Sequence, residues 1–192
     1  MKFAKITSAL TIAAVSVALT QSAFAGPSKD KVVPGKPGKA DIVVTAIAAN
    51  ADLEVFDTLL AAATCEYFDG AVVDILTGDD KVTLFAPVDT AFAKLGLNDA
   101  NVCAAFEEDP NGLLTILAYH VTEGRRFSNS VFNKRGNAKE IEMLLGTGFI
   151  TTEDGMIEDA QGQEINVVAP FININASNGV IHVIDTVILP QS

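Results

Sequence analysis

Apolar residues recur at helical spacing through the first half of the chain. Asp41 is suited to cap a helix that ends near Asn50, and Asp52 signals a new helix start. The second segment carries an apolar stripe typical of a helix lying on a core: Leu53, Phe56, Leu59, Leu60 and Ala63. Shorter helices are predicted at three places farther along the chain: 89–95, 99–107 and 111–119.

The second half of the chain changes to short β-type runs. An earlier run, 82–85, already combines β-branched and aromatic residues and stops at Pro87. The later runs are separated by glycine-containing turns: 141–145, 149–152, 165–168, 171–174 and 180–189. The last run is nearly unbroken in its β-branched residues, as expected of a strand with two buried faces. Helices followed by strands, without βαβ alternation, predict an α+β fold.

The N-terminal 40 residues stand apart from this pattern. Residues 1–25 have a basic start, a 14-residue apolar stretch and an Ala-Phe-Ala site, which predict a signal peptide cleaved near Ala25. A membrane anchor is the alternative, but about 20 apolar residues are needed to span a bilayer. Residues 26–40, rich in Pro, Gly and Lys, predict a linker. We therefore expect one domain at 41–192, secreted or periplasmic and not membrane-spanning.

Charge limits the possible partners. The chain of 192 residues has a formal charge of −11 and is 49% hydrophobic, which fits a folded domain rather than a disordered chain. Residues 41–192 contain 23 acidic and seven basic residues. Because nonspecific affinity for nucleic acid comes from Lys and Arg, so acidic a domain is not expected to bind it.

The few basic residues of the domain are concentrated in one stretch. Five of the seven lie within 15 residues: Arg125, Arg126, Lys134, Arg135 and Lys139. This basic segment could bind a sulfated or uronic polysaccharide. The alternative is a solvated loop without a partner.

The two cysteines, Cys65 and Cys103, are expected to form a disulfide. Export would place them in an oxidising compartment, and an even pair is most simply bridged. A metal pair and a catalytic thiol are the alternatives. A thiolate nucleophile needs a nearby base, which the sequence does not supply.

Catalytic and metal-binding patterns are missing from the sequence. The two histidines, His120 and His182, both lie within apolar runs, and no Gly-x-Ser-x-Gly elbow or zinc-type spacing occurs. The acidic turn at 153–159 lacks the alternating oxygen ligands of a calcium loop. We therefore predict a protein that is not an enzyme and that uses no metal or cofactor.

Two longer motifs carry more information. Residues 83–92 read TLFAPVDTAF, a strand that enters a Pro-opened turn and a helix that Asp89 is expected to cap. Residues 178–185 read NGVIHVID, a tight turn that enters the buried strand. With 117–121 and 143–146 between them, these motifs resemble the fasciclin domain family in order and spacing, over about residues 40–190.

The resemblance implies an α+β fold, a fasciclin-like β-wedge of about seven strands with helices packed along one side. It implies adhesion or binding of proteins or glycans at the cell surface or in an extracellular or biofilm matrix, without catalysis. The alternative function is that of a carrier that binds an apolar small ligand, such as a carotenoid, in a groove between helices and sheet. The signature positions fall on these residues: Thr83, Phe85, Ala86, Pro87, Asp89 and Phe92, then Asn178, Gly179, His182 and Asp185.

Two further positions bear on recognition. Tyr119 and His120 match the family's Tyr-His segment, which is tied to receptor adhesion in animal members; a buried structural role for His120 is the other interpretation. The Asp-Ile pair of the animal integrin motif falls here on Asn173-Ile174. Because the acid is missing, integrin is not a predicted partner.

Overall fold

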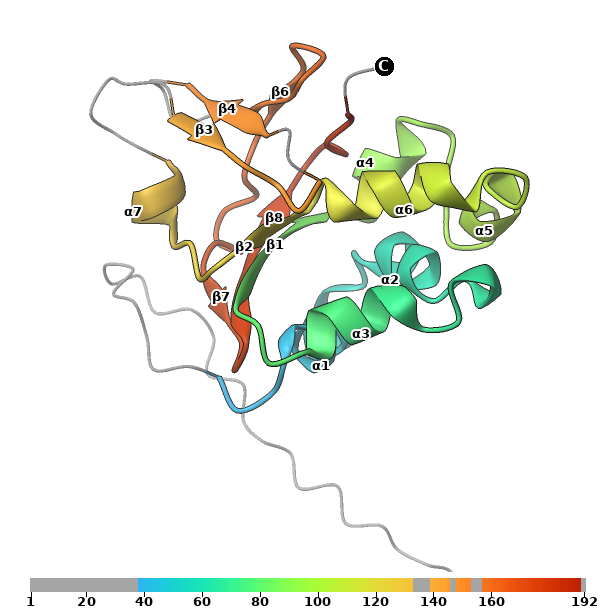
Figure 1. The fold of residues 1–192 in the computed structure, drawn as a ribbon, viewed down its shortest axis with the longest axis horizontal. Coiled ribbons are helices and arrows are strands. Elements are labelled where there is room, and N and C mark those ends of the chain that lie inside the picture. Colours follow the sequence, from blue (N-terminus) through green and yellow to red (C-terminus); the bar gives the residue numbers. More distant parts are fainter. Residues whose placement is uncertain (1–37, 133–138, 146–147, 153–156, 191–192) are drawn as a thin grey trace, which may run out of the picture. The chain divides into compact units, whose positions relative to one another are not determined.

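Helices cover one side of a central β-sheet, and a second sheet lies on the other side (Figure 1). The computed structural model describes residues 38–132, 139–145, 148–152 and 157–190, and they fall in the compact unit Lys31–Ser192. The predicted signal peptide and most of the predicted linker lie outside the described residues. The α+β prediction is confirmed, with eight strands in the described parts of the chain.

The helices come mostly from the first half of this unit. Their bounds are α1 (Ile42–Leu53), α2 (Asp57–Ala63), the 3₁₀ helix η1 (Glu66–Phe68), α3 (Ala71–Thr77), α4 (Asp89–Ala93), α5 (Val102–Ala105), α6 (Pro110–Ala118) and α7 (Ser128–Val131).

The central sheet has the strand order β2-β1-β8-β7. Its strands are β1 (Val82–Pro87), β2 (Val121–Glu123), β7 (Ile174–Asn175) and β8 (Gly179–Ile184). Strands β1 and β8 pair in parallel, with Phe85 opposite His182, and every residue of both strands is buried. The two signature motifs are therefore neighbours, and the prediction of a strand with two buried faces is confirmed.

The second sheet has the order β3-β4-β5-β6, with all pairs antiparallel. Its strands are β3 (Lys139–Ile141), β4 (Phe149–Thr151), β5 (Ile157–Glu158) and β6 (Glu164–Ile165). Its inner face packs on the central sheet through a separate hydrophobic core that includes Ile141, Phe149 and Phe85. Phe85 and Phe149 meet edge to face at 4.9 Å between ring centroids.

Side-chain caps explain where the first helices begin and end. Asp41 accepts a hydrogen bond from the N–H of Val44, which confirms its predicted capping role. Asp52 does not start a helix, because α1 continues to Leu53. The side chain of Asn50 instead accepts from the N–H groups of Val55 and Phe56 and shapes the link to α2.

Candidate functional site

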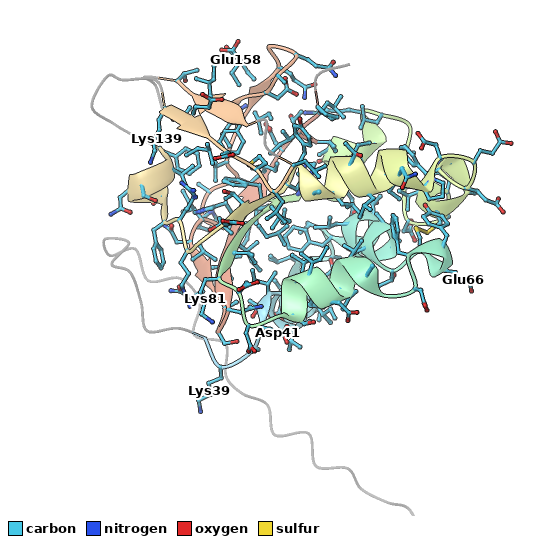
Figure 2. The ribbon with its side chains drawn as sticks, viewed as in Figure 1. Lys39, Asp41, Glu66, Lys81, Lys139 and Glu158 are labelled. Atoms are coloured by element: carbon cyan, nitrogen blue, oxygen red, sulfur yellow. A yellow bond between two sulfur atoms is a disulfide. The ribbon has the colours of Figure 1, made fainter. Side chains whose placement is uncertain are left out.

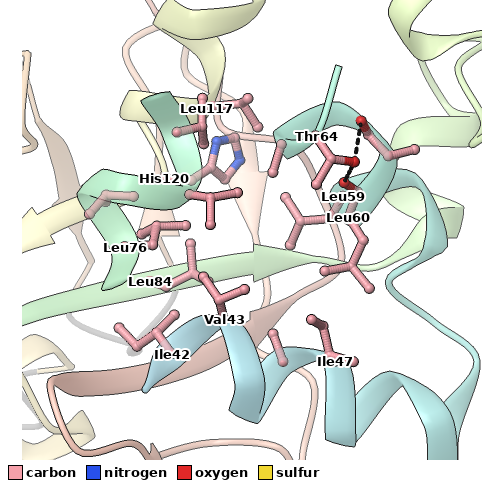
Figure 3. A pocket seen from close by; sticks show the side chains of 16 residues that line it. Ile42, Val43, Ile47, Leu59, Leu60, Thr64, Leu76, Leu84, Leu117 and His120 are labelled. Atoms are coloured by element: carbon pink, nitrogen blue, oxygen red, sulfur yellow. Dashed lines mark hydrogen bonds between the residues drawn. The ribbon is translucent and has the colours of Figure 1, made fainter. Parts of the chain in front are cut away.

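An apolar pocket lies between helices α1, α2 and α3 and strand β1 (Figure 3). Its cavity has a volume of about 260 Å³, just below the range of roughly 300–1,000 Å³ that is typical of small-molecule sites. Most of its lining is aliphatic: Ile42, Val43, Ala46, Ile47, Leu59, Leu60, Val72, Val73, Leu76 and Leu84. Leu117, His120 and Val121, where α6 meets β2, also line it.

The polar groups in this pocket are already bonded within the protein. Thr64 Oγ1 donates to the carbonyl of Leu60 at 2.7 Å, and both ring nitrogens of His120 have backbone partners. Every buried side-chain nitrogen or oxygen among the described residues is hydrogen-bonded. A ligand in the pocket therefore meets hydrocarbon, and a polar group placed there would lose its hydrogen bonds to water.

Large apolar side chains are also exposed on the helices around the pocket. Val44 and Ile47 on α1 and Ile75 on α3 are 51%, 50% and 50% exposed. Ile47 is itself a lining residue, so the pocket continues to the protein surface. Exposed apolar side chains beside a hollow are typical of binding sites.

His120 is a buried structural residue. Its Nδ1–H donates to the carbonyl of Ile116 at 2.7 Å, and its Nε2 accepts from the N–H of Ile188 at 2.9 Å. Burial lowers the pKa of His120 to about 4, against the opposing effect of the Ile116 hydrogen bond. The ring is therefore neutral, and both of its nitrogens are bonded to backbone groups rather than free for a ligand. Tyr119 is buried as well, in the core between the sheets.

His182 lies at the centre of β8 and is fully buried. Its Nδ1 accepts from the N–H of Asn173 at 3.3 Å, and its Nε2–H donates to the carbonyl of Arg126 at 2.8 Å. Its ring stacks on Phe85 at 5.4 Å. Burial lowers the pKa of His182 to about 4, although the hydrogen bond to Arg126 opposes this shift.

Asn178 connects three elements. Its Oδ1 accepts from the N–H of Ile42 at 2.9 Å, and its Nδ2 donates to the carbonyls of Leu76 at 2.7 Å and Gly78 at 3.3 Å. The next residue, Gly179, packs against the carbonyl of Val82 and the side chain of Ile42, where a Cβ would collide with both. This turn therefore positions α1 and α3, two walls of the pocket, against the sheet.

Asp89 caps a helix, but not the predicted one. The N-cap residue of α4 is Val88, and no side chain caps this helix. The Asp89 carboxylate instead accepts hydrogen bonds from the N–H groups of Asp57 at 3.3 Å and Thr58 at 2.7 Å. Asp89 therefore caps the N-terminus of α2, where Thr58 lies 31 residues before it in the sequence. Sequence spacing reveals only local caps, so this long-range partner could not be inferred.

The rest of the first motif and Asp185 are also structural. Thr83, Phe85, Ala86, Pro87 and Phe92 are all buried. Asp185 accepts from Asn166 and from the Thr186 hydroxyl. Partial burial raises the pKa of Asp185, but these hydrogen bonds and nearby Lys94 together hold it below its usual value.

Some side chains of the predicted basic segment form hydrogen bonds within the domain. The Arg125 guanidinium donates to the carbonyls of Ser177 and Ala176 and to Asn175 Oδ1. Arg126 Nε donates to the carbonyl of Glu123, and Lys139 Nζ donates to that of Ser130. Lys134 and Arg135 lie outside the described residues.

Asn173, at the position of the integrin acid, bonds through its side chain to both the N–H and hydroxyl groups of Ser128.

Cys65 and Cys103 form the expected disulfide, with a Cα–Cα distance of 5.5 Å. It joins the end of α2 to α5 (Figure 2). Within the described ranges, three or more His, Cys, Asp or Glu residues nowhere gather in a way that could hold a metal ion. The described helices are also all too short or too polar to cross a membrane.

Sequence reasoning missed the wall of the pocket formed by α3. The sequence pattern described above includes no helix over 71–77, a stretch that is short and partly β-branched. The spacing of its buried residues, Val72 and Leu76, is the signal that could have revealed it. The pocket itself depends on several distant segments, so no local pattern predicts it.

Comparisons with known proteins agree with the fold. The chain is 32% identical to "Protein sll1483" of Synechocystis over 78% of this chain and 76% of that protein, and 34% identical to "Uncharacterized protein sll1735" of Synechocystis over 71% and 90%. A solved FAS1 domain pair from the insect cell adhesion molecule Fasciclin I matches with a TM-score of 0.56 at 16% identity. The match covers 79% of this chain and about half, 51%, of the insect chain. The sequence model of the fasciclin domain matches residues 56–190, so the chain belongs to the fasciclin domain family, whose members are typically adhesion or binding modules.

Proposed function

We propose that this protein is an exported, non-enzymatic binding module that carries an apolar small ligand between α1, α2, α3 and β1. The observation that carries the proposal is the 260 Å³ cavity with its aliphatic lining and exposed rim residue Ile47. Buried apolar surface contributes about 25 cal/mol per Å² on transfer from water, which supports hydrocarbon as the ligand.

The proposed organisation is a signal peptide at 1–25, a linker at 26–40 and a binding domain at 41–192. Cleavage near Ala25 would release the domain to the periplasm, the cell surface or an extracellular matrix. The linker's C-terminal end is close to the domain, since Ser177 donates its N–H to the carbonyl of Ala40.

A titration with Nile red, an uncharged apolar dye, tests the pocket directly. Ala46 lines the pocket and is buried, whereas Ala48 is exposed on the same helix and does not line it. We expect Ala46→Phe to weaken dye binding at least about tenfold and Ala48→Phe to leave it unchanged.

Overpacking costs about 1–3 kcal/mol, so thermal unfolding must show that the filled variant is folded. If it is not folded, Ala61→Phe at the partly exposed pocket wall replaces it. Equal dye binding by the folded filled variant and the Ala48→Phe control would contradict the proposal.

The second candidate function is adhesion through an anionic glycan bound by the basic segment. Its support is the concentration of five cations within residues 125–139. Arg125 is better left unchanged in a test, because its three hydrogen bonds hold the chain around Ser177.

Binding to a glycan array tests this second function. We expect reversal of Arg126, Lys134, Arg135 and Lys139 to Glu to abolish salt-sensitive binding to sulfated or uronic glycans. Lys39→Glu with Lys81→Glu is a control outside the basic segment. Unchanged glycan binding by the variant with all four substitutions would contradict this function. Absence of glycan binding by the wild-type protein would contradict it as well.

A further inference from the structure

The elements that line the pocket carry charge of only one sign. Residues 41–80, which form α1, α2, η1 and α3, contain nine Asp or Glu residues and no Lys, Arg or His. The other lining elements, β1 and the stretch 110–121, contain no Asp, Glu, Lys or Arg. These lining elements are therefore anionic wherever they are charged.

Several of these acids lie within two residues of lining residues. Asp41 precedes Ile42 and Val43, Asp74 follows Val73, and Glu66 lies two residues after Thr64. Glu66 and Asp74 are exposed, so their carboxylates lie in solvent. Figure 2 shows Asp41 and Glu66 well apart along the helical layer.

The cations that flank this segment in sequence do not cancel its charge. Lys39 and Lys81 flank the segment at its two ends, and Lys81 Nζ donates to the carbonyl of Asp79. Two positive charges leave a large acidic excess over residues 39–81. At low salt the Debye length reaches about 30 Å, so these charges act together on a ligand at the pocket.

We propose that the pocket selects a cationic amphiphile, with an aliphatic chain inside and a positively charged nitrogen at the rim. No buried side-chain nitrogen or oxygen among the described residues is left unpaired for a ligand, so a charged head must stay outside the interior. The acidic side chains of the lining helices attract an ammonium group at the pocket mouth and repel a carboxylate or phosphate. This inference rests on the proposed function, because it assumes that the pocket holds an apolar ligand.

Three ligands with linear chains of the same total carbon count separate head charge from tail burial. Dodecyltrimethylammonium, dodecanol and dodecanoate, each below its micelle concentration, are used to displace Nile red from the full-length protein. At about 10 mM salt we expect the ammonium to bind at least about tenfold more tightly than the carboxylate, with the alcohol between them. At about 500 mM salt we expect the difference to shrink to about threefold or less.

Matched charge variants test whether the rim is responsible. Asp74→Asn with Glu66→Gln removes two charges beside lining residues. Glu158→Gln with Glu164→Gln removes two charges from β5 and β6, in the second sheet. We expect only the first pair of substitutions to reduce the preference for the ammonium ligand over the carboxylate ligand, by about threefold or more at low salt.

The possible failures are distinguishable. If dodecanol does not bind, the pocket is not a site for apolar ligands and the proposed function fails. If dodecanol binds but dodecanoate binds as tightly as the ammonium, the charge selection fails and the proposed function stands. If both variant pairs narrow the preference equally, the whole acidic molecule and not the pocket rim is responsible, which overturns the inference.

Discussion

At the scale of single residues, the polar signature positions hold the fold together. Asn178 bonds to α1 and to the end of α3, and His182 bonds to Asn173 and Arg126. Both side chains are buried and satisfied, so neither offers a free group to a partner. These signature side chains are therefore hydrogen-bonded within the fold.

Asn178→Ala should destabilise the protein strongly. The substitution leaves the N–H of Ile42 and the carbonyl of Leu76 without their partner, and each buried unsatisfied group costs about 1–3 kcal/mol. We expect the free energy of unfolding in urea to fall by about 3 kcal/mol. Asn166→Ala, at an exposed position, should cost less than about 1 kcal/mol. Similar losses for the two variants would contradict the role given to Asn178.

The two histidines should make stability depend on pH. Their pKa is about 4 in the folded protein against 6.5 for an ordinary histidine, so the unfolded chain takes up protons first as the pH falls. The contribution of the two neutral histidines to the free energy of unfolding is fully present above about pH 6.5. It is lost as the pH falls toward about 4, by up to about 3 kcal/mol per histidine.

Proton NMR of the folded protein measures these groups individually. We expect the Cε1–H signals of His120 and His182 to stay at their neutral positions from about pH 8 down to about pH 5.5. A titration midpoint near 6.5 for either ring would show that it is not held neutral by burial.

At the scale of helices and strands, local pattern predicts an element better than its partners. Asp41 caps α1 as its position predicts, and 180–184 is buried on both faces as its composition predicts. Asp89 is predicted to cap the following helix but caps α2, because α2 packs against α4. Helix α3 and the pocket it walls were missed, since they depend on tertiary packing of short segments.

Asp89→Ala should loosen α2 rather than α4. Loss of a cap costs about 1 kcal/mol, and here it exposes the N–H groups of Asp57 and Thr58. Amide hydrogen exchange should therefore speed up in α2 and remain unchanged in α4. Asp89→Asn keeps the acceptor oxygen and should largely preserve protection in α2. Faster exchange confined to α4 would restore the local capping role.

Removal of the disulfide should weaken the link between α2 and α5. Cys65 and Cys103 are 38 residues apart, and a loop of that size is worth about 3–4 kcal/mol on the chain-entropy model. We expect Cys65→Ala with Cys103→Ala to lower the free energy of unfolding by about that amount in urea. Reduction of the wild-type protein should match the double variant; an unchanged unfolding midpoint in both would be inconsistent with a stabilising cross-link.

At the scale of the whole molecule, two hydrophobic cores lie on opposite sides of the central sheet. The core between the two sheets contains Phe85, Phe149 and Ile165. The core under the helices borders a cavity, and its surrounding helices are acidic. This asymmetry separates a structural side from a proposed binding side. The chain thus combines the architecture of a fasciclin domain with an apolar pocket that we propose binds a small ligand.

Native mass spectrometry of the protein purified from the organism that makes it tests the central claim most directly. We predict a bound apolar molecule at a ratio of about one per chain, retained in Ala48→Phe and lost in folded Ala46→Phe. Bare protein mass in every sample, together with a wild-type protein that does not bind Nile red, would contradict the account.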